Sequence, residues 1–266
     1  MRKYFLPAAS AFLLLLIWKL AVGVFDIQAY ILPEPEKIIR ALFEDRQVLF
    51  AHGLQTAIEA LSGFLLAIIA GLFLALLMAR YSSVKEALYP FVIISQTIPV
   101  MAMAPILIIW FGYGLLPKIV VVGLVCFFPV TVSLVEGMAK VDPDVIKLLQ
   151  AMGASESQIL RKVRLPAVIP ALFAGIKISA AYSIMGAVIA EWLGASKGLG
   201  IYLMRSMHSF RTERVFAAIL VISVLSLLVF AAVEVISRLV MPWQYRYSSS
   251  KNPMEDEIMT KNNSDD

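Results

Sequence analysis

The chain has few of the residues that usually carry enzyme chemistry. Its 266 residues include one cysteine, Cys126, and two histidines, His52 and His208. A single cysteine excludes an internal disulfide. Neither histidine belongs to a His-Glu-x-x-His zinc motif, and no Lys-Ser or Lys-Thr follows a glycine at the spacing of a Walker A loop. We therefore expect no catalytic residues, no metal, no cofactor and no ATP hydrolysis by this chain.

Charge is also scarce. Only 16% of the residues are charged, 60% are hydrophobic, and the mean hydropathy is +0.83. This composition excludes an ordinary soluble domain and predicts an all-α polytopic protein of the lipid bilayer. The net charge of +4 is small. It fits an uneven distribution of charge among loops better than a nucleic-acid-binding surface.

Six apolar segments have the length expected of membrane spans. The first follows Arg2 and Lys3, and Ala21 and Gly23 near its end mimic a cleavage site. It is therefore either a retained anchor or a cleaved signal peptide. Beyond Trp243 the tail is polar, and we expect it to be disordered. The six expected spans are residues 6–25, 58–79, 88–111, 119–135, 168–190 and 215–240.

An amphipathic helix is expected between the first two spans. Pro33 and Pro35 end one element and start the next. The apolar residues that follow recur at helical spacing, so the helix is expected to lie along the outer membrane interface, although an ordinary connector is equally compatible. The stripe consists of Ile38, Ile39, Leu42 and Phe43.

Two spans carry small residues at strict four-residue intervals. Such stripes let helices approach closely in lipid, so we interpret both as packing surfaces. The second stripe leads to Glu191 on the same face. Lys177 lies in the same span, and we favour snorkelling toward the interface over an ion pair for it. The stripes are Gly63, Ala67, Gly71, Ala75 and Ala79, and then Ala171, Gly175, Ser179, Ser183 and Ala187.

The third span is broken by Pro90, Pro99 and Pro105. Polar side chains and free carbonyls at membrane depth are tolerated against protein or a water-filled cavity, which places this segment on the substrate path. The alternative is a kinked helix whose Ser and Thr side chains bond to their own backbone. The residues predicted to lie along the path are Ser95, Gln96, Thr97, Ser179, Ser183 and Glu191.

A polar segment, residues 142–166, separates the fourth and fifth spans. Asp142 can cap a helix that starts at Pro143 and stops at Gly153. Ser155 and Gln158 form a capping box for a second helix. The second helix is expected to turn Ile159, Leu160 and Val163 inward and Arg161, Lys162 and Arg164 outward. The first helix has an apolar face of Val145, Leu148, Leu149 and Met152.

This segment resembles the EAA loop of binding-protein-dependent ABC importer permeases. The family pattern is Glu-Ala-Ala, three residues, Gly, nine residues and Ile-x-Leu-Pro. Here Gly153, Leu165 and Pro166 match it in place, while Val163 stands at the isoleucine position. The Glu-Ala-Ala positions hold Lys147, Leu148 and Leu149 instead. The resemblance covers residues 32–243 and implies that the loop contacts an ATPase. The predicted contact residues are Val145, Leu148, Leu149, Met152, Gly153, Ala154, Leu165 and Pro166.

Basic residues indicate the orientation. Thirteen lie on the side of the polar segment and eight on the other, although four of the eight fall in the last outer segment. The excess predicts that both termini and the polar segment are cytoplasmic. We divide the chain into an anchor with an outer amphipathic segment (1–51), a transmembrane domain (52–240) with a coupling loop (137–166), and a tail (241–266).

The resemblance implies a six-helix type I importer permease in the bacterial cytoplasmic membrane, with a retained first helix. It implies an ATPase dimer, an extracytoplasmic binding protein and a second permease copy as partners. The sequences of residues 95–114 and 191–194 are most similar to the branch that imports formylaminopyrimidine or hydroxymethylpyrimidine. Sulfonate, taurine or nitrate are the alternative substrates. An ion-coupled secondary transporter is the other class, but it predicts buried ionisable pairs within the spans, and the sequence offers no convincing pair.

Overall fold

The computed structural model describes residues 2–244, and every element within this range is a helix. The all-α prediction is confirmed. The predicted disordered tail lies almost entirely outside the described residues. The elements are α1 (Arg2–Val24), α2 (Pro35–Glu44), α3 (Arg46–Arg80), α4 (Ser82–Ser95), α5 (Val100–Phe111), α6 (Leu116–Ala139), α7 (Pro143–Ala151), α8 (Glu156–Ile159), a π-helical turn η1 (Leu160–Arg164), α9 (Leu165–Glu191), α10 (Leu199–His208) and α11 (Thr212–Val240).

Four helices are long and apolar enough to cross a membrane: α3, α6, α11, and the continuous helix from Glu156 to Glu191 that contains α9. Helices α4 and α5 form a fifth candidate span, because they pass the same test together although they are bent by 103°. The apolar part of α1, Ala9–Val24, is shorter than these spans. The expected sixth span therefore stays a prediction.

Helices α3, α6 and α9 form the centre of the molecule, and both small-residue stripes lie in their interfaces. A Cβ on Gly63 would approach the Val122 side chain to 2.5 Å, and one on Gly175 would approach the Pro129 carbonyl oxygen to 2.4 Å. Side chains of any size are therefore excluded at these crossings. The main apolar core fills the same interfaces, and the predicted packing role of the stripes is confirmed.

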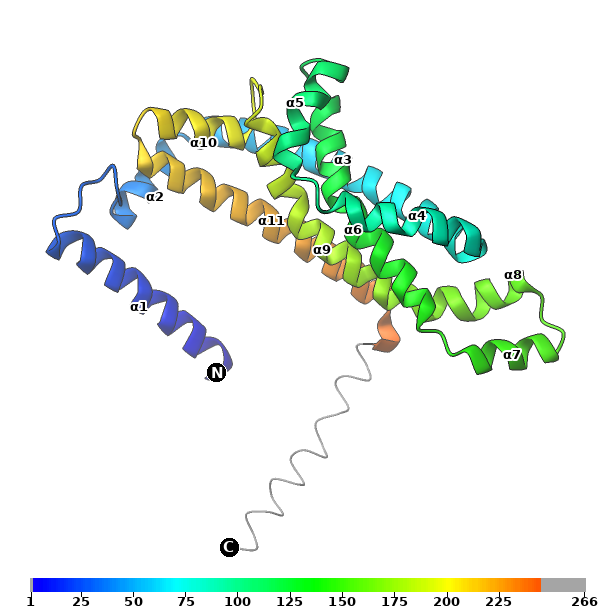
Figure 1. Ribbon diagram of the computed structural model, residues 1–266. Coiled ribbons are helices and arrows are strands. Elements are labelled where there is room, and N and C mark those ends of the chain that lie inside the picture. The colour runs from blue at the N-terminus through cyan, green and yellow to red at the C-terminus, as the bar shows by residue number, and fades with distance from the viewer. Residues whose placement is uncertain (1, 245–266) are drawn as a thin grey trace, which may run out of the picture.

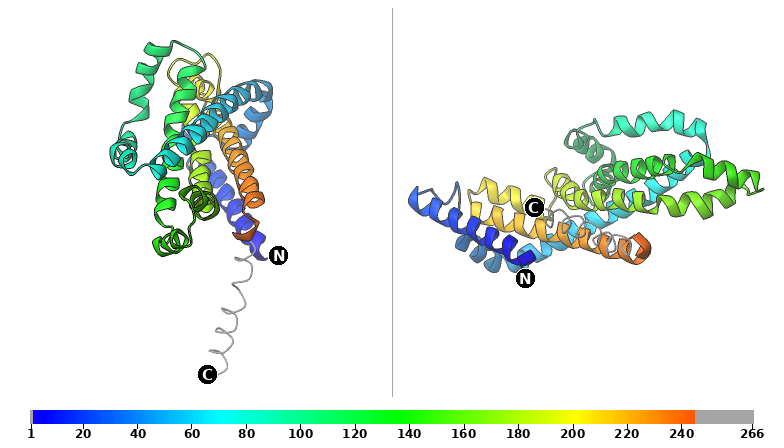
Figure 2. Two further views of the ribbon diagram at one scale, coloured as in Figure 1. Left: turned by 90° about the vertical axis from the view of Figure 1, so that its right-hand side faces the viewer. Right: turned by 90° about the horizontal axis from the view of Figure 1, so that it is seen from below.

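The remaining helices surround this centre and give the molecule two different ends. Figure 1 shows α7 and α8 projecting at the end where α11 finishes, whereas α2 and α10 lie near the start of α11. Helix α1 lies to one side of the bundle in Figure 1 and in the right-hand view of Figure 2. Its residue Lys19 pairs with Glu36 of α2, and Trp18 packs against Phe216.

Three expectations about individual segments need correction. The second span begins as a helix at Arg46 rather than near residue 58, and its 35 residues extend over roughly 52 Å, well beyond the hydrocarbon core. The expected separate helix after Ser155 continues through η1 into α9. Pro166 supplies no N–H for the helical ladder, and the π turn before it, with Leu165 N bonded to Leu160 O, keeps the helix continuous.

The outer amphipathic helix also differs from expectation. In α2, Ile38 and Ala41 are buried in an apolar cluster shared with residues of α10 and α11, while Ile39 and Phe43 of the predicted stripe are exposed. The helix therefore packs on protein along one face, in addition to presenting apolar side chains outward.

Candidate functional site

The hairpin of α7 and α8 has the local structure that its sequence predicts. The Asp142 carboxylate accepts a hydrogen bond from the Asp144 N–H at 2.9 Å, and Ser155 and Gln158 form the capping box. At the elbow, Gly153 has φ of +84°. Gly153 N donates to Gln150 O and Ala154 N to Leu149 O, both at 2.9 Å. These two bonds form a Schellman motif, which ends α7 without leaving its last carbonyls unpaired.

The hairpin presents an apolar face that the described part of the chain leaves largely uncovered. Leu148 is 61% exposed and Met152 is 74% exposed. Leu149, Ala154 and Val163 are partly covered and line a groove beside the elbow. An exposed apolar face on a rigid, capped hairpin is the arrangement expected of a protein-docking element. The predicted contact role of the eight loop residues stays a prediction.

The second helix orients its residues largely as expected. Ile159 is buried, and Leu160 and Val163 are partly buried, while Arg161 and Lys162 are exposed. Arg164 departs from the expected outward orientation, because it is only partly exposed and lines a polar cavity with Lys85 between the hairpin and α3.

The predicted substrate-path residues fall into three groups in the structure. The Ser95 and Thr97 hydroxyls donate to the carbonyl oxygens of Val92 and Ile94, at 2.7 and 2.8 Å. This is the self-bonding arrangement that the alternative interpretation of the broken segment predicts. Both residues and Gln96 are exposed at the bend between α4 and α5.

Ser179 and Ser183 form the second group, inside the helix bundle. The Ser179 hydroxyl donates to the Cys126 carbonyl oxygen at 2.7 Å, and the Ser183 hydroxyl donates to the Ala180 carbonyl oxygen at 2.9 Å. Both serines are fully buried. They support the packing of α9 in this conformation, and the structure does not bring them together with Ser95 and Thr97.

Glu191 belongs to a third group, a buried polar cluster opposite the hairpin end. Its Oε1 accepts a hydrogen bond from the Thr56 hydroxyl at 2.6 Å, and its Oε2 accepts one from the Gly200 N–H at 2.5 Å. Thr56 Oγ1 in turn accepts from the Leu199 N–H at 2.8 Å. The cluster thus joins α3, the C-terminus of α9 and the turn that starts α10.

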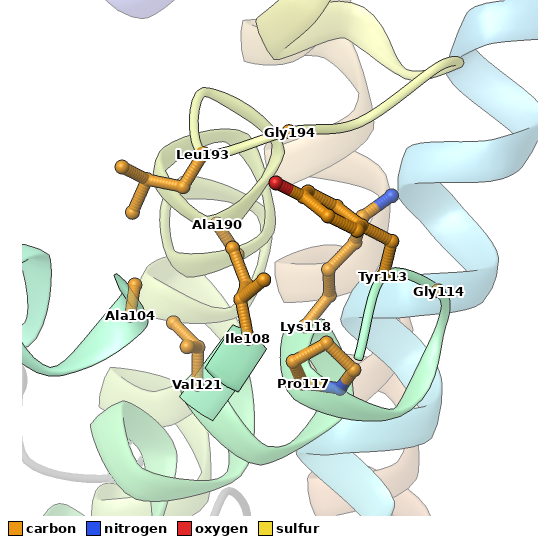
Figure 3. Close-up of a pocket in the computed structure, with 10 residues that line it drawn as sticks. All are labelled: Ala104, Ile108, Tyr113, Gly114, Pro117, Lys118, Val121, Ala190, Leu193 and Gly194. Carbon is orange, nitrogen blue, oxygen red and sulfur yellow. The ribbon is translucent and has the colours of Figure 1, made fainter. Parts of the chain in front are cut away.

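Glu59 and Lys118 complete this cluster. Lys118 Nζ lies 2.6 Å from Glu59 Oε1, and Gln55 Nε2 donates to the same oxygen at 2.8 Å. Glu59 is fully buried. The Lys118 amine points toward α3 (Figure 3), while the stem of this side chain lines a small pocket with Tyr113 and residues of α5 and α9.

Neighbouring glycines are required by the close packing around Glu191. Gly198 has φ of +129°, and a Cβ there would lie 2.1 Å from the Glu191 Cδ. The sequence of residues 194–198 also matches the Gly-x-Ser-x-Gly motif. They form a loop between two helices, whereas a nucleophile elbow follows a strand. His52 Nδ1 accepts a hydrogen bond from the Gly198 N–H at 2.9 Å, which fixes this loop.

A second polar group holds α10 against the start of α3. The Tyr202 hydroxyl donates to Asp45 Oδ2 at 2.6 Å, and Arg214 Nε lies 3.1 Å from the same oxygen. Burial and the hydrogen bond to Asp45 raise the pKa of Tyr202, so this hydroxyl stays protonated and donating.

Two charged pairs inside the spans were missed by sequence reasoning. Glu59 pairs with Lys118, and Lys177 Nζ lies 2.6 Å from Glu234 Oε2, which corrects the snorkelling expected of Lys177. The sequence contains a signal for the Glu59–Lys118 pair. Glu59, Lys118 and Glu191 each lie near the outer end of an expected span, so all three share one depth.

Comparison with known proteins places the chain in a transport family. The model of the family described as "Binding-protein-dependent transport system inner membrane component" matches residues 65–242. The chain is 35% identical to the formylaminopyrimidine transport permease protein ThiX of Halalkalibacterium halodurans, over 90% of this chain and 95% of that protein. It is 30% identical to the putative aliphatic sulfonates transport permease protein SsuC of Bacillus subtilis, over 93% and 89%.

A solved structure shows the same fold. A chain of the MetNI methionine ABC transporter, in inward-facing conformations, matches with a TM-score of 0.62 and 19% identity, over 73% of this chain and 97% of that chain. The expected permease fold is confirmed, whereas the count of six spans stays a prediction. The chain belongs to the family of inner-membrane components of binding-protein-dependent transport systems, the permeases of ABC importers.

Proposed function

We propose that this permease carries a small neutral pyrimidine, formylaminopyrimidine or hydroxymethylpyrimidine, across the bacterial cytoplasmic membrane. Its similarity to a formylaminopyrimidine permease over nearly the full length of both chains supports this substrate more than any other observation. The residue types agree, because Ser95, Gln96 and Thr97 are polar side chains without charge. Lys177, the cation that would suit an anionic substrate, pairs with Glu234, which also pairs with Arg238.

ATP-driven motion would enter through the α7–α8 hairpin. Its apolar face fits the groove of an ATPase subunit, and its caps make it a rigid body. Because α8 continues through η1 into α9, a displacement of the hairpin would act directly on α9. Helix α9 packs along α6 and α3, so the same displacement would reorient the centre of the permease.

The complete transporter would contain two copies of this chain, because each copy presents a single hairpin. An ATPase dimer would bind the hairpins in the cytoplasm, an extracytoplasmic binding protein would deliver substrate, and both permease termini would lie in the cytoplasm. Residues 1–51 would form the anchor region, residues 52–240 the transporting core and residues 241–266 a cytoplasmic tail.

The coupling role is tested by Leu149→Asp. A charge in the hairpin groove is expected to abolish ATPase co-purification and uptake, while the variant still inserts and melts like the wild type. Ser157→Asp serves as the matched control, because it introduces the same charge at an exposed position of the hairpin outside the predicted contact residues, and it is expected to leave both properties intact. Normal co-purification and uptake by Leu149→Asp would show that the hairpin is not the coupling element.

The substrate is tested by competition. Cells that express the complete transporter are expected to take up labelled aminopyrimidine in the presence of excess taurine, alkanesulfonate or nitrate, and unlabelled pyrimidine is expected to block uptake. Strong inhibition by one of the anions, with none by unlabelled pyrimidine, would replace the pyrimidine with that anion and leave the permease function unchanged.

The two charged pairs inside the spans are a feature that proton and sodium pathways share, so an ion-coupled secondary transporter is the second candidate to test. Uptake by the permease in liposomes without ATPase and binding protein, driven by an ion gradient, distinguishes this candidate. An ABC importer is expected to show none.

A further inference from the structure

Four basic residues in the last expected outer segment run against the charge bias of the other loops. Three of them, Arg205, Arg211 and Arg214, line one cavity with a volume of about 510 Å³. The cavity lies between the start of α3, helix α10 and the turn that joins α10 to α11. The fold therefore gathers most of the basic residues that depart from the bias into a single site.

The cavity has more positive charge than the neighbouring residues neutralise. Arg214 Nε lies 3.1 Å from Asp45 Oδ2, which accounts for one of the arginines. Arg205 and Arg211 form no ion pair among the described residues. Glu213, the acid next to Arg214 in the sequence, does not line the cavity. Three guanidinium groups and one carboxylate leave a surplus of two positive charges, which attracts an anion.

The hydroxyl groups of the cavity wall already donate to the protein, so the guanidinium groups supply the free donors. The Tyr202 hydroxyl donates to Asp45 Oδ2, and the Ser206 hydroxyl donates to the Tyr202 carbonyl oxygen. The Ser209 hydroxyl donates to the Arg205 carbonyl oxygen at 2.8 Å. The planar fork of an arginine matches the oxygens of a phosphate or carboxylate, and two such forks without acidic partners suit an oxyanion.

The turn that carries Arg211 has a backbone conformation that L residues rarely adopt. Phe210 has φ of +54°. Arg211 N donates to Ser206 O and Phe210 N donates to Met207 O, both at 3.0 Å. These bonds form a Schellman motif, whose left-handed position is usually glycine. A phenylalanine is unfavourable there, and its ring is exposed rather than packed in the core. The turn thus fixes the backbone of Arg211 at the cavity and leaves an aromatic ring on the surface.

The cavity lies at the depth of lipid headgroups. His52, which lines it, precedes the expected apolar span at residue 58 by roughly 9 Å along the helix. Arg214 directly precedes the last expected span. Headgroups extend roughly 5–8 Å beyond the hydrocarbon core on each side, and any tilt of α3 brings His52 closer to it. Phe50 and Phe210, which lie within two residues of lining residues, are exposed at the same level.

The cavity is also separate from the predicted substrate path. Helix α10 packs on α3, α9 and α11. In Figure 1 and in the right-hand view of Figure 2, α10 and the start of α11 lie on the side of α1 and α2, away from α4. The predicted path residues 95–97 lie at the bend between α4 and α5. An anion in the cavity would therefore not be the transported solute.

We propose that this cavity binds the phosphate group of an anionic phospholipid such as phosphatidylglycerol. Arg205 and Arg211 bind the phosphate oxygens, and the exposed rings of Phe50 and Phe210 contact the glycerol and acyl region. A zwitterionic lipid binds less well, because its ammonium group meets the surplus positive charge. The bound lipid bridges α10 and the start of α11, so it stabilises this end of the permease.

Thermal unfolding of the purified full-length permease in neutral detergent tests the site. Added short-chain phosphatidylglycerol is expected to raise the melting temperature by about 5 °C at concentrations well above its Kd, and phosphatidylcholine is expected to have little effect. The double variant Arg205→Gln/Arg211→Gln is expected to lose the shift. Without lipid it should melt within about 2 °C of the wild type, because neither arginine has an acidic partner to lose.

Two further variants sharpen this test. Arg40→Gln/Lys197→Gln removes two exposed cations that do not line the cavity, so it is the matched control and is expected to keep the full shift. Ser209→Glu retains both arginines and places a carboxylate in the cavity wall. It is expected to abolish the shift, and it decides the question even where the arginine variant melts lower without lipid.

Four outcomes would overturn the proposal. A full shift in Arg205→Gln/Arg211→Gln and in Ser209→Glu would place the lipid elsewhere. An equal shift from phosphatidylcholine would show that charge is not recognised. An equal shift from inorganic phosphate at the same concentration would show a site for free anions. Loss of binding-protein-stimulated ATP hydrolysis by the complete transporter, with the lipid shift retained, would assign the arginines to a contact with that protein. The lipid measurements need neither substrate nor ATPase, so they are independent of the proposed transport function.

Discussion

The two ends of this permease are built by different means. At the hairpin end, α7 buries none of its residues, and its shape is fixed by Asp142, Gly153 and Ser155, which act on their immediate neighbours. At the opposite end, the cluster around Glu191 is buried and joins residues as much as 146 positions apart. The hairpin end therefore contributes little to the stability of this chain, whereas the outer end stabilises it.

The difference follows from what each end has to do. A docking element has to leave its apolar face exposed until a partner covers it, so it relies on caps and turns that need no tertiary contacts. The outer end closes a bundle of helices around charged groups, and each of those groups requires a partner from another helix. Variants at the two ends should consequently separate stability from coupling.

The largest effect on stability is expected from Lys118→Met. This change leaves negative charge buried without its cation, which costs roughly 3–5 kcal/mol. The matched control is Lys37→Met, because Lys37 pairs with Glu34 on the surface, where such pairs contribute about 0–1 kcal/mol. Thermal unfolding in detergent measures both. Equal melting temperatures for the two variants would show that the buried cluster does not stabilise the fold.

Gly175→Leu should come next, because it acts on the packing that both ends share. A side chain at this position meets the Pro129 carbonyl oxygen and Ser133, so α6 and α9 must separate at a cost of roughly 3 kcal/mol. The amount of monodisperse protein after extraction is the measurement. Ile178→Leu, at a half-exposed position on the same helix, is the control. Similar yields from both variants would contradict the close contact.

Gly153→Val should give a smaller loss of stability and a large loss of coupling. An added Cβ at Gly153 meets no atom within 4 Å, so the expected cost of about 1–2 kcal/mol is backbone strain at positive φ. ATP-dependent uptake should fall severely, because the elbow angle changes. Gly153→Asn, which tolerates this conformation better, should restore most uptake. Full uptake by the valine variant would separate the elbow from coupling.

The smallest effect is expected from Asp142→Ala. Loss of the N-cap should destabilise α7 by about 1 kcal/mol, with no detectable change in the melting of the whole chain, because α7 is only weakly joined to the rest. Hydrogen exchange of the first α7 amides should increase, and Asp142→Asn should prevent the increase. A lower melting temperature for the whole protein would show that the hairpin supports the fold after all.

Much of the fold and of the hairpin could be predicted from the sequence. The glycines at 63, 71 and 175 correctly mark helix contacts, because close approach in lipid requires small residues at helical spacing. The bend at Pro99 and the caps at Asp142 and Ser155 are equally local. The substrate path is less accessible to this reasoning. The path role of Ser179 and Ser183 stays a prediction: the Ser179 hydroxyl donates to α6 and the Ser183 hydroxyl to its own helix in the structure.

By itself, the sequence determined the helical membrane class, the packing stripes and the form of the hairpin, because periodicity and capping are properties of neighbouring residues. Only the tertiary structure decided the partners of buried charges. Lys177 pairs with Glu234, and Glu59 pairs with Lys118 beside Glu191. Sequence position gives the depth of each charge, but helix rotation and neighbour order determine which charges meet, and these emerge only when the helices pack together.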